Sequence, residues 1–355
     1  MSQPFRLAFL GIDNPHGAAW RELLLNFGDE VRITAILPGF DGATASLEER
    51  LSDVPRYATV DDLLTSASFD GAVVCLPNDS GPKAIAKLAN AGKHILVEKP
   101  VAGSADDARQ IADAVRNSGV AFQNGYMWRY DDGANRLRDM IADGRFGHLI
   151  SVEATYVTSD VNRRGAKHYL FDAAISKRGF FNWLACHYLD LVFYLTGRPI
   201  LGVTARTGVF GATPADVEDG GVAIIELEGG AIFTLLGGYW IPRWQGETHW
   251  CVRGSERWVH WDPTRVGTSG SLEIHGPKPQ WFSLDETFDL PVDNTKGYGG
   301  RRGVALVRDW LQAAREGGRP CRNTPETTVA TLELIDAIYQ SSREGRRIEC
   351  RLGSE

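Results

Sequence analysis

The sequence predicts an α/β domain with a doubly wound parallel sheet, followed by an α+β domain with a large, mainly antiparallel open sheet. In the first third of the 355-residue chain, short apolar runs alternate with amphipathic stretches, as in parallel strands joined by crossover helices. In the second half, apolar runs pair across glycine turns such as Gly229-Gly230, which is typical of hairpins. We therefore expect domains over residues 1–125 and 126–355, and leave open whether the last helices pack back on the first domain.

The first domain is expected to alternate between strands and helices. Gly92 and Gly119 follow two amphipathic stretches and are typical of helix ends, while Thr59 is placed as a helix N-cap. The expected strands are 5–10, 31–37, 70–76, 95–97 and 120–124, and the expected helices are 18–25, 82–91 and 104–117, with a short one beginning near residue 59.

In the second domain, helices are expected first and last, with paired strands between them. The helices are expected at 132–143, 180–195, 303–316 and 327–341, and the strands at 148–157, 203–210, 221–228, 231–240, 249–253 and 257–261. Such an antiparallel sheet has one face available for a ligand.

The turn after the first strand is a candidate phosphate-binding turn. It reads Gly11-Ile-Asp-Asn-Pro-His-Gly17, and backbone N–H groups at a helix start can hold a pyrophosphate. The GxGxxG pattern would need glycine where Asp13 stands, so an ordinary strand–helix turn is an equally good interpretation. The second strand ends in Pro38-Gly39, with Asp41 further on, and lacks the acid that usually binds an adenosine ribose. The choice between NAD and NADP stays open, with a lean to NAD from the general acidity of the chain.

A short apolar strand ends in Glu98-Lys99-Pro100. Ligands of open α/β sheets bind outside the carboxyl ends of the strands, so Lys99 stands where a cofactor or substrate would lie. A lysine at that place can transfer a proton. The alternative is a surface ion pair between Glu98 and Lys99, with Pro100 beginning a loop.

The helix expected at 180–195 carries Trp183, His187 and Asp190 at spacings that place them on one face. A histidine held by a carboxylate one turn away can serve as a general base near neutral pH. A buried core histidine, hydrogen-bonded to Asp190 or to a carbonyl, is the alternative.

Composition excludes several classes of partner. The net charge of −7 gives no reason to expect nucleic acid or an anionic membrane. The five cysteines are an odd number, are widely spaced and lack a CxxC pair, which argues against a disulfide framework or a zinc site. No apolar run approaches the ~20 residues of a membrane span, and no signal-type segment opens the chain. We expect a cytoplasmic protein with no metal site and a small-molecule partner.

These motifs together resemble the Gfo/Idh/MocA oxidoreductases, and the resemblance covers nearly the whole chain. It depends on Leu76-Pro77-Asn78, on Ala91-Gly-Lys-His94 leading into Glu98-Lys99-Pro100, and on Tyr126-Met-Trp-Arg129. It continues through Gly179, His187 and Asp190, Val217-Glu-Asp219, Ala337-Ile-Tyr339, Ser341 and Gly345-Arg-Arg347.

The resemblance implies a Rossmann domain that binds NAD or NADP, and a C-terminal domain whose open sheet carries the substrate and packs against a second subunit as a homodimer or homotetramer. It implies hydride transfer between nicotinamide and a secondary alcohol of a sugar, cyclitol or related polyol. Lys99 would stand at the nicotinamide and His187 would be the base, oriented by Asp190. The expected cofactor-binding residues are Gly11, Asp13, His16, Gly17, Leu76, Pro77, Asn78, Glu98, Lys99 and Pro100. The expected substrate residues are Trp183, Arg129, Arg163 and Trp240.

The sequence departs from the family pattern at several positions. Asp13 interrupts the glycine motif, Pro38 replaces the ribose-binding acid, and Gly81 replaces a histidine. Trp183 stands where the family has a second catalytic acid, and Lys177-Arg178 replace two of three glycines. Trp183 is either a stacking wall for a ring-shaped substrate or a core residue.

Two alternatives to a dehydrogenase follow from the missing acid. One is a redox-neutral glycosidase or lyase that retains NAD, in which transient oxidation acidifies a C–H bond and allows elimination. The other is a catalytically weak dinucleotide-binding sensor or subunit.

Overall fold

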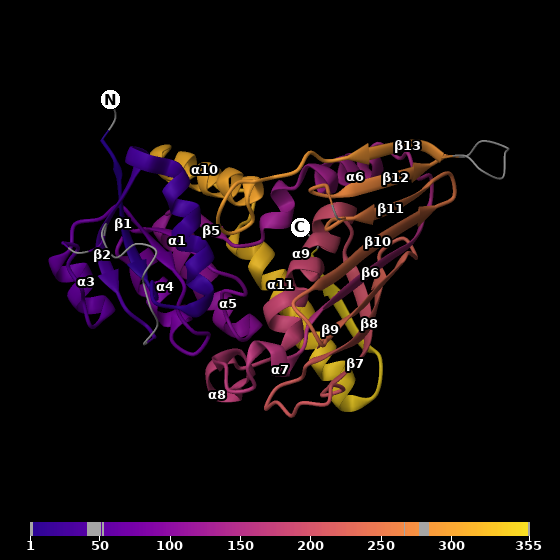
Figure 1. Ribbon diagram of the computed structural model, residues 1–355, viewed down its shortest axis with the longest axis horizontal. Helices are drawn as coiled ribbons and strands as arrows, with labels where there is room; N and C mark the ends of the chain where they lie inside the picture. Colours follow the sequence, from indigo (N-terminus) through magenta and orange to yellow (C-terminus); the bar gives the residue numbers. More distant parts are fainter. Residues whose placement is uncertain (1–2, 41–50, 52, 266, 277–283, 354–355) are drawn as a thin grey trace. The chain divides into compact units, whose positions relative to one another are not determined.

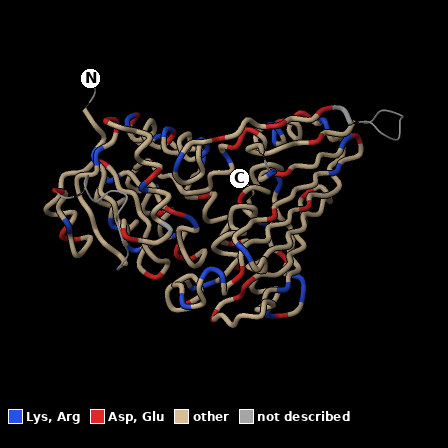
Figure 2. The backbone as a smooth tube through the Cα atoms, in the orientation of Figure 1, with Lys and Arg blue, Asp and Glu red and all other residues tan. Residues whose placement is uncertain are grey.

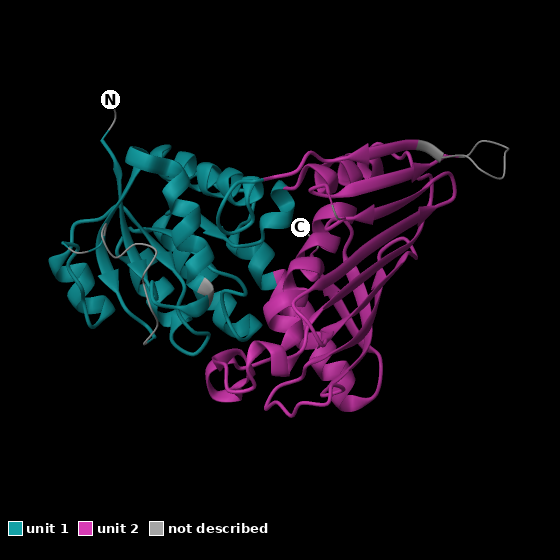
Figure 3. Cartoon of the chain, in the orientation of Figure 1, with its two compact units in different colours: residues 1–130, 294–329 teal, residues 131–293, 330–355 magenta. Residues whose placement is uncertain are grey.

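The computed structural model describes residues 3–40, 51, 53–265, 267–276 and 284–353 (Figure 1). Asp41 lies outside these residues, and so does the side chain of His16. The chain divides into two compact units, one of residues 1–130 and 294–329 and the other of residues 131–293 and 330–355 (Figure 3). The third crossing between units falls within helix α11 (Pro325–Glu344).

Unit 1 is built on a parallel sheet with the strand order β2-β1-β3-β4-β5. Parallel strands need crossover connections, and the helices supply them. The strands are β1 (Phe5–Leu10), β2 (Val31–Leu37), β3 (Gly71–Val74), β4 (His94–Val97) and β5 (Phe122–Asn124). The helices are α1 (Ala18–Leu24), α3 (Val60–Ser66), α4 (Gly81–Asn90), α5 (Ala105–Ser118) and α10 (Arg301–Arg315), with the 3₁₀ turns η1 (Pro15–Gly17), η2 (Leu25–Glu30) and η4 (Met127–Tyr130). The predicted doubly wound parallel sheet is confirmed.

Helices cover both faces of this sheet. On one face, Trp20 of α1 and Trp310 of α10 are fully buried in a core with Phe9 and Leu96 of the strands. Helices α4 and α5 pack against each other, and α4 also contacts β3 and β4. Ser104 and Thr59 cap α5 and α3 by accepting from the backbone N–H three residues ahead. Because the strands are covered on both sides, only their ends are open to a ligand.

Unit 2 is built on a nine-stranded sheet with the order β13-β12-β11-β10-β6-β9-β8-β7-β14. Strands β6 and β9 pair in parallel, and the other neighbours are antiparallel, which confirms the predicted mainly antiparallel sheet. The strands are β6 (Leu149–Ser159), β7 (Ile200–Gly208), β8 (Gly220–Leu227), β9 (Ile232–Ile241), β10 (Gly246–Gly254), β11 (Trp258–Asp262), β12 (Ser271–His275), β13 (Leu284–Asp289) and β14 (Ile348–Leu352). The sequence prediction did not include β12, β13 or β14, each of which has only five or six residues.

Helices α6 (Asp132–Ala142), α9 (Cys186–Thr196) and α11 lie on one face of this sheet (Figure 1). Ser341 and Ser342 of α11 accept hydrogen bonds from the backbone N–H groups of Ala205 and Thr207 in β7. The short helices α7 (Val161–Arg164) and α8 (Ala173–Ser176) and the 3₁₀ turn η5 (Tyr169–Phe171) follow β6. Asp160 caps α7 by accepting from the backbone N–H of Arg163.

Charged residues of both signs are interspersed over the described parts of both units (Figure 2). Of the helices that the structure describes, none is long and apolar enough to cross a membrane.

Candidate active site

The glycine turn of unit 1 lies where β1, β2 and β3 end. A Cβ atom on Gly11 would come within 2.5 Å of the carbonyl oxygen of Cys75, and Gly11 has a φ of +69°, so only glycine fits there. The Asn14 amide donates to the same carbonyl oxygen at 2.7 Å, and the Arg21 guanidinium donates to the carbonyl oxygen of Ile12. The side chains of Asn14 and Arg21 thus hold the turn in place. Because Gly11 has no side chain, a phosphate group can approach the backbone closely, as a dinucleotide-binding turn requires.

The Asp13 side chain bridges from this turn to the end of β2. Its two carboxylate oxygens accept from the backbone N–H groups of Gly39 and Phe40, at 2.7 and 2.8 Å. Asp13 is 5% exposed. The sequence pattern identified Asp13 only as an interruption of GxGxxG, and no local pattern indicated its contact 26 residues away.

Residues that follow four parallel strands lie along one edge of the sheet. The strands pair in register at Leu10 with Leu37, Leu10 with Val74, and Val74 with Val97. The residues directly after these positions are Gly11, Pro38, Cys75 and Glu98. The structure therefore brings together the predicted cofactor-binding residues of the glycine turn, of Leu76-Pro77-Asn78 and of Glu98-Lys99-Pro100.

Lys99 and Glu98 form a buried pair at this edge. The Lys99 Nζ atom is 3.7 Å from Glu98 Oε1, and the two side chains are only 8% and 10% exposed. The alternative of a surface ion pair is therefore wrong. Burial raises the pKa of Glu98 to about 7, and the neighbouring Lys99 limits the rise. A buried cation thus stands at the carboxyl end of β4, with the Lys99–Pro100 peptide bond in cis.

Arg129 lies in η4 and is also buried. Its guanidinium donates to the carbonyl oxygen of Arg322 at 3.5 Å, and Arg322 donates in return to the carbonyl oxygen of Arg129 at 2.6 Å. These bonds give Arg129 a role within unit 1, and its contact with substrate stays a prediction.

In unit 2, His187 and Asp190 lie one turn apart on α9 and are 4% and 0% exposed. A turn of π-helix, η6 (Phe181–Ala185), comes directly before α9. The sequence prediction assumed one regular α-helix from residue 180 and placed Trp183 on the same face as His187 and Asp190. That assumption was wrong, because a π turn holds more residues than an α turn and changes the spacing. Turns of π-helix inside α-helices occur often at functional sites.

Trp183 lies in this π turn and is 4% exposed. The ring of Trp183 packs edge-on against the ring of Tyr169, with 5.8 Å between the two ring centroids. The ring centroids of Tyr169 and His168 are 4.7 Å apart. The three rings form a continuous aromatic contact that runs from the π turn to η5.

Glu218 holds the start of the helix that carries His187. Its carboxylate accepts from the backbone N–H groups of Gly179 and Phe181 at 2.9 and 3.1 Å, and from the Tyr339 hydroxyl. Its carbonyl oxygen accepts from the N–H of Phe180 at 3.2 Å. A Cβ on Gly179 would lie 1.9 Å from that carbonyl oxygen, so this position needs glycine. Burial raises the pKa of Glu218. The sequence motif Val217-Glu-Asp219 includes Glu218, but it did not predict that this side chain holds the start of the helix.

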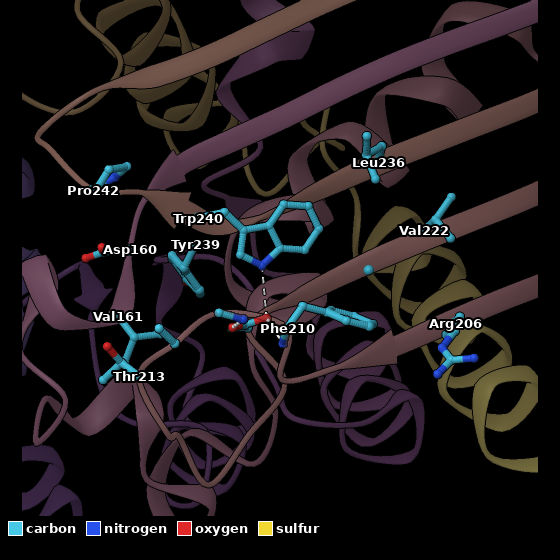
Figure 4. A pocket seen from close by; sticks show the side chains of 14 residues that line it. Asp160, Val161, Arg206, Phe210, Thr213, Val222, Leu236, Tyr239, Trp240 and Pro242 are labelled. Atoms are coloured by element: carbon cyan, nitrogen blue, oxygen red, sulfur yellow. Dashed lines mark hydrogen bonds between the residues drawn. The ribbon is translucent and has the colours of Figure 1, made fainter.

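The next residue, Asp219, fixes the side chain of Trp240. Asp219 is fully buried and accepts from Trp240 Nε1 at 3.0 Å and from the N–H groups of Phe210 and Gly211. These residues line a pocket of about 620 Å³ (Figure 4). Its other walls include Arg206, Val222, Leu236 and Pro242.

The predicted substrate residues of unit 2 therefore fall into two groups. Trp240 lines this pocket, and Arg163 donates to the carbonyl oxygen of the pocket residue Pro242 at 3.4 Å. Trp183 and His187 do not line it. The structure groups Arg163 with Trp240 rather than with Trp183.

Comparison with known proteins gives matches over both units. Residues 5–126 match the model of an oxidoreductase family with an NAD-binding Rossmann fold, and residues 134–260 match the GFO/IDH/MocA C-terminal domain. The chain is 25% identical over 334 residues to D-xylose 1-dehydrogenase (NADP(+)) 2 of Haloferax volcanii, covering 90% of this chain and 92% of that protein. It is 24% identical over 277 residues to 2,7-anhydro-N-acetylneuraminate hydratase of Escherichia coli, covering 77% and 71%.

The fold is also that of solved structures. The chain superposes on a levoglucosan dehydrogenase in complex with NADH and L-sorbose with a TM-score of 0.83, covering 99% of this chain and 100% of that chain at 17% identity. This likeness shows the fold.

Proposed function

Because the chain belongs to the Gfo/Idh/MocA family and is an NAD(P)-dependent oxidoreductase, we propose that Lys99 and His187 catalyse its oxidation of a secondary alcohol of a sugar, cyclitol or related polyol. The observation that carries this proposal is the buried Lys99 at the edge of the sheet that also holds the glycine turn. The relatives named for sugar chemistry support the substrate class.

The residues have separate tasks in this reaction. A bound dinucleotide would supply the nicotinamide ring as the hydride acceptor for the carbinol carbon. The hydroxyl proton must leave at the same time, and His187 takes it as the general base. Asp190, one turn further along α9, orients the imidazole. The Lys99 ammonium stabilises the negative charge that develops on the alkoxide oxygen.

A second candidate is a redox-neutral reaction in which the enzyme retains its cofactor. The similarity to a hydratase supports it, and so does Trp183, which supplies no carboxylate for a proton relay to His187. In that reaction the hydride returns to the product, so no reduced cofactor accumulates.

We also propose that the protein is a cytoplasmic homodimer or homotetramer that associates through the open face of its large sheet. Val222, Ile224, Ile232 and Leu236 project from β8 and β9 and are between 39% and 46% exposed. Val222 pairs directly with Leu236 in the sheet register, so this apolar surface is continuous across the two strands. The cysteines are free thiols, which suits a reducing compartment.

The experiment is a panel of sugars and cyclitols offered to the purified protein with NAD or NADP, with reduced nicotinamide as the readout. Lys99→Ala should abolish turnover while the dissociation constant of the dinucleotide stays within roughly tenfold. Lys99→Arg keeps the charge and serves as the matched control. Normal turnover in Lys99→Ala would refute the role of Lys99.

A further inference from the structure

The Asp13 carboxylate stands at the carboxyl end of β2, although Asp13 belongs to the turn after β1. Its oxygens accept from the N–H groups of Gly39 and Phe40, which follow β2 after only one intervening residue, Pro38. Leu10 and Leu37 pair at the ends of the two strands, so the side chain crosses between neighbouring strand ends.

That place has a general function in dinucleotide-binding folds. An acid about 20 residues after the glycine motif, at the end of the second strand, accepts a hydrogen bond from the ribose 2′-hydroxyl of NAD. In this chain β2 is followed by Pro38, Gly39 and Phe40, which carry no carboxylate. We propose that Asp13, from the turn after β1, supplies the carboxylate that usually follows β2, and that it makes the protein selective for NAD(H) over NADP(H). This inference rests on the proposed function.

The chemistry of the group suits that task. A carboxylate has about four acceptor positions, and the two backbone bonds use two of them, so a ribose hydroxyl can donate to another. A 2′-phosphate brought to the same place would meet a negative charge in a poorly solvated site, where repulsion is strong. Asp13 is 5% exposed, so little water screens that charge.

The nearby cation of the turn is Arg21. Its guanidinium donates to the carbonyl oxygens of Ile12 and Asn14, and it also interacts electrostatically with Asp13. Arg56 flanks β2 through a backbone bridge at Ile36 and is a rival that would favour NADP instead. The two possibilities predict opposite cofactor preferences.

The test measures dissociation constants for NAD⁺ and NADP⁺ by calorimetry on the full chain, at fixed and low ionic strength. The wild type should prefer NAD⁺ by at least about tenfold, because like charges are opposed at the 2′ position. Asp13→Asn keeps an acceptor for one backbone N–H but removes the charge, and should reduce this preference by about tenfold, chiefly through tighter NADP⁺ binding. Asp13→Glu should restore part of the preference. Thermal unfolding of each variant establishes that it is folded.

Asp41→Asn is the matched control, because Asp41 is the acid that follows β2 in the sequence. It should leave the ratio of the two dissociation constants within about twofold. The inference is overturned if Asp13→Asn changes both constants by the same factor, if Asp41→Asn shifts the ratio, or if the wild type prefers NADP⁺. Failure of the wild type to bind either dinucleotide would contradict the proposed function itself.

Discussion

Replacing Glu218 by alanine should destabilise the protein more than its position in a loop before β8 suggests. The side chain accepts from Gly179 N, Phe181 N and the Tyr339 hydroxyl. These donors lie at the start of the π turn that leads to α9 and on α11. Removing the acceptor leaves three donors to find other partners.

The size of the effect follows from those bonds. A hydrogen bond to a charged acceptor contributes about 1.5–3 kcal/mol, so three bonds set an upper limit near 4.5–9 kcal/mol. Burial raises the pKa of Glu218 despite the bonds from Tyr339, Phe181 and Gly179, so the cost of burying the charged carboxylate brings the net effect well below that limit. We therefore expect Glu218→Ala to lower the free energy of unfolding by about 3–5 kcal/mol. Glu218→Gln keeps one acceptor oxygen and should lower the free energy of unfolding by less than half of the Glu218→Ala value.

The assay is urea unfolding followed by tryptophan fluorescence and circular dichroism, which also reveals whether the two units unfold together. Glu226→Ala is the matched control, since Glu226 lies on β8 and forms an exposed ion pair with Arg347 at 2.6 Å. An exposed pair contributes little to stability. If Glu218→Ala lowers the free energy of unfolding by no more than Glu226→Ala does, the idea that Glu218 anchors the His187 helix is refuted.

Two further predictions concern Trp183 and Glu98. Trp183→Asp should lower the free energy of unfolding by about 3–5 kcal/mol, because it leaves a cavity and an unpaired buried carboxylate. Trp183→Phe should fold and raise KM for ring-shaped substrates with little change in kcat; an unchanged KM would make Trp183 a core residue only. The raised pKa of Glu98, about 7 against an ordinary 4.5, means that the folded state holds its proton over a pH range where the unfolded state has lost it. Stability should therefore fall as pH rises from 4.5 to 7, by about 3 kcal/mol in total. Glu98→Gln should remove that slope in paired urea titrations, and an identical slope in both proteins would contradict the assignment.

The sequence predicted the features that depend on local pattern. Alternating apolar runs predicted the parallel strands of unit 1, and the abrupt end of an apolar run before Glu98-Lys99 predicted the end of a strand there. The hairpin at Gly229-Gly230 was predicted by its turn residues. Each of these signals lies within a few consecutive residues.

The features that the sequence did not predict depend on contacts between distant residues. The bonds of Asp13 to the end of β2 and of Glu218 to the start of η6 cross 26 to 39 residues. The π turn around Trp183 has no local signature that separates it from an α turn. Strand β14 is a short edge strand whose residues alternate between apolar and charged, but its partner β7 lies far from it in the sequence, so no local pattern indicates the pairing.

The most direct test of the proposed reaction follows the hydrogen atom itself. The protein is incubated with a substrate from the panel that carries deuterium on the carbinol carbon, and both products are analysed by mass spectrometry. Hydride transfer predicts that deuterium appears on the nicotinamide ring in an amount equal to the ketone formed, and that His187→Ala loses both together. Product formed without labelled nicotinamide would contradict the dehydrogenase and favour the redox-neutral reaction.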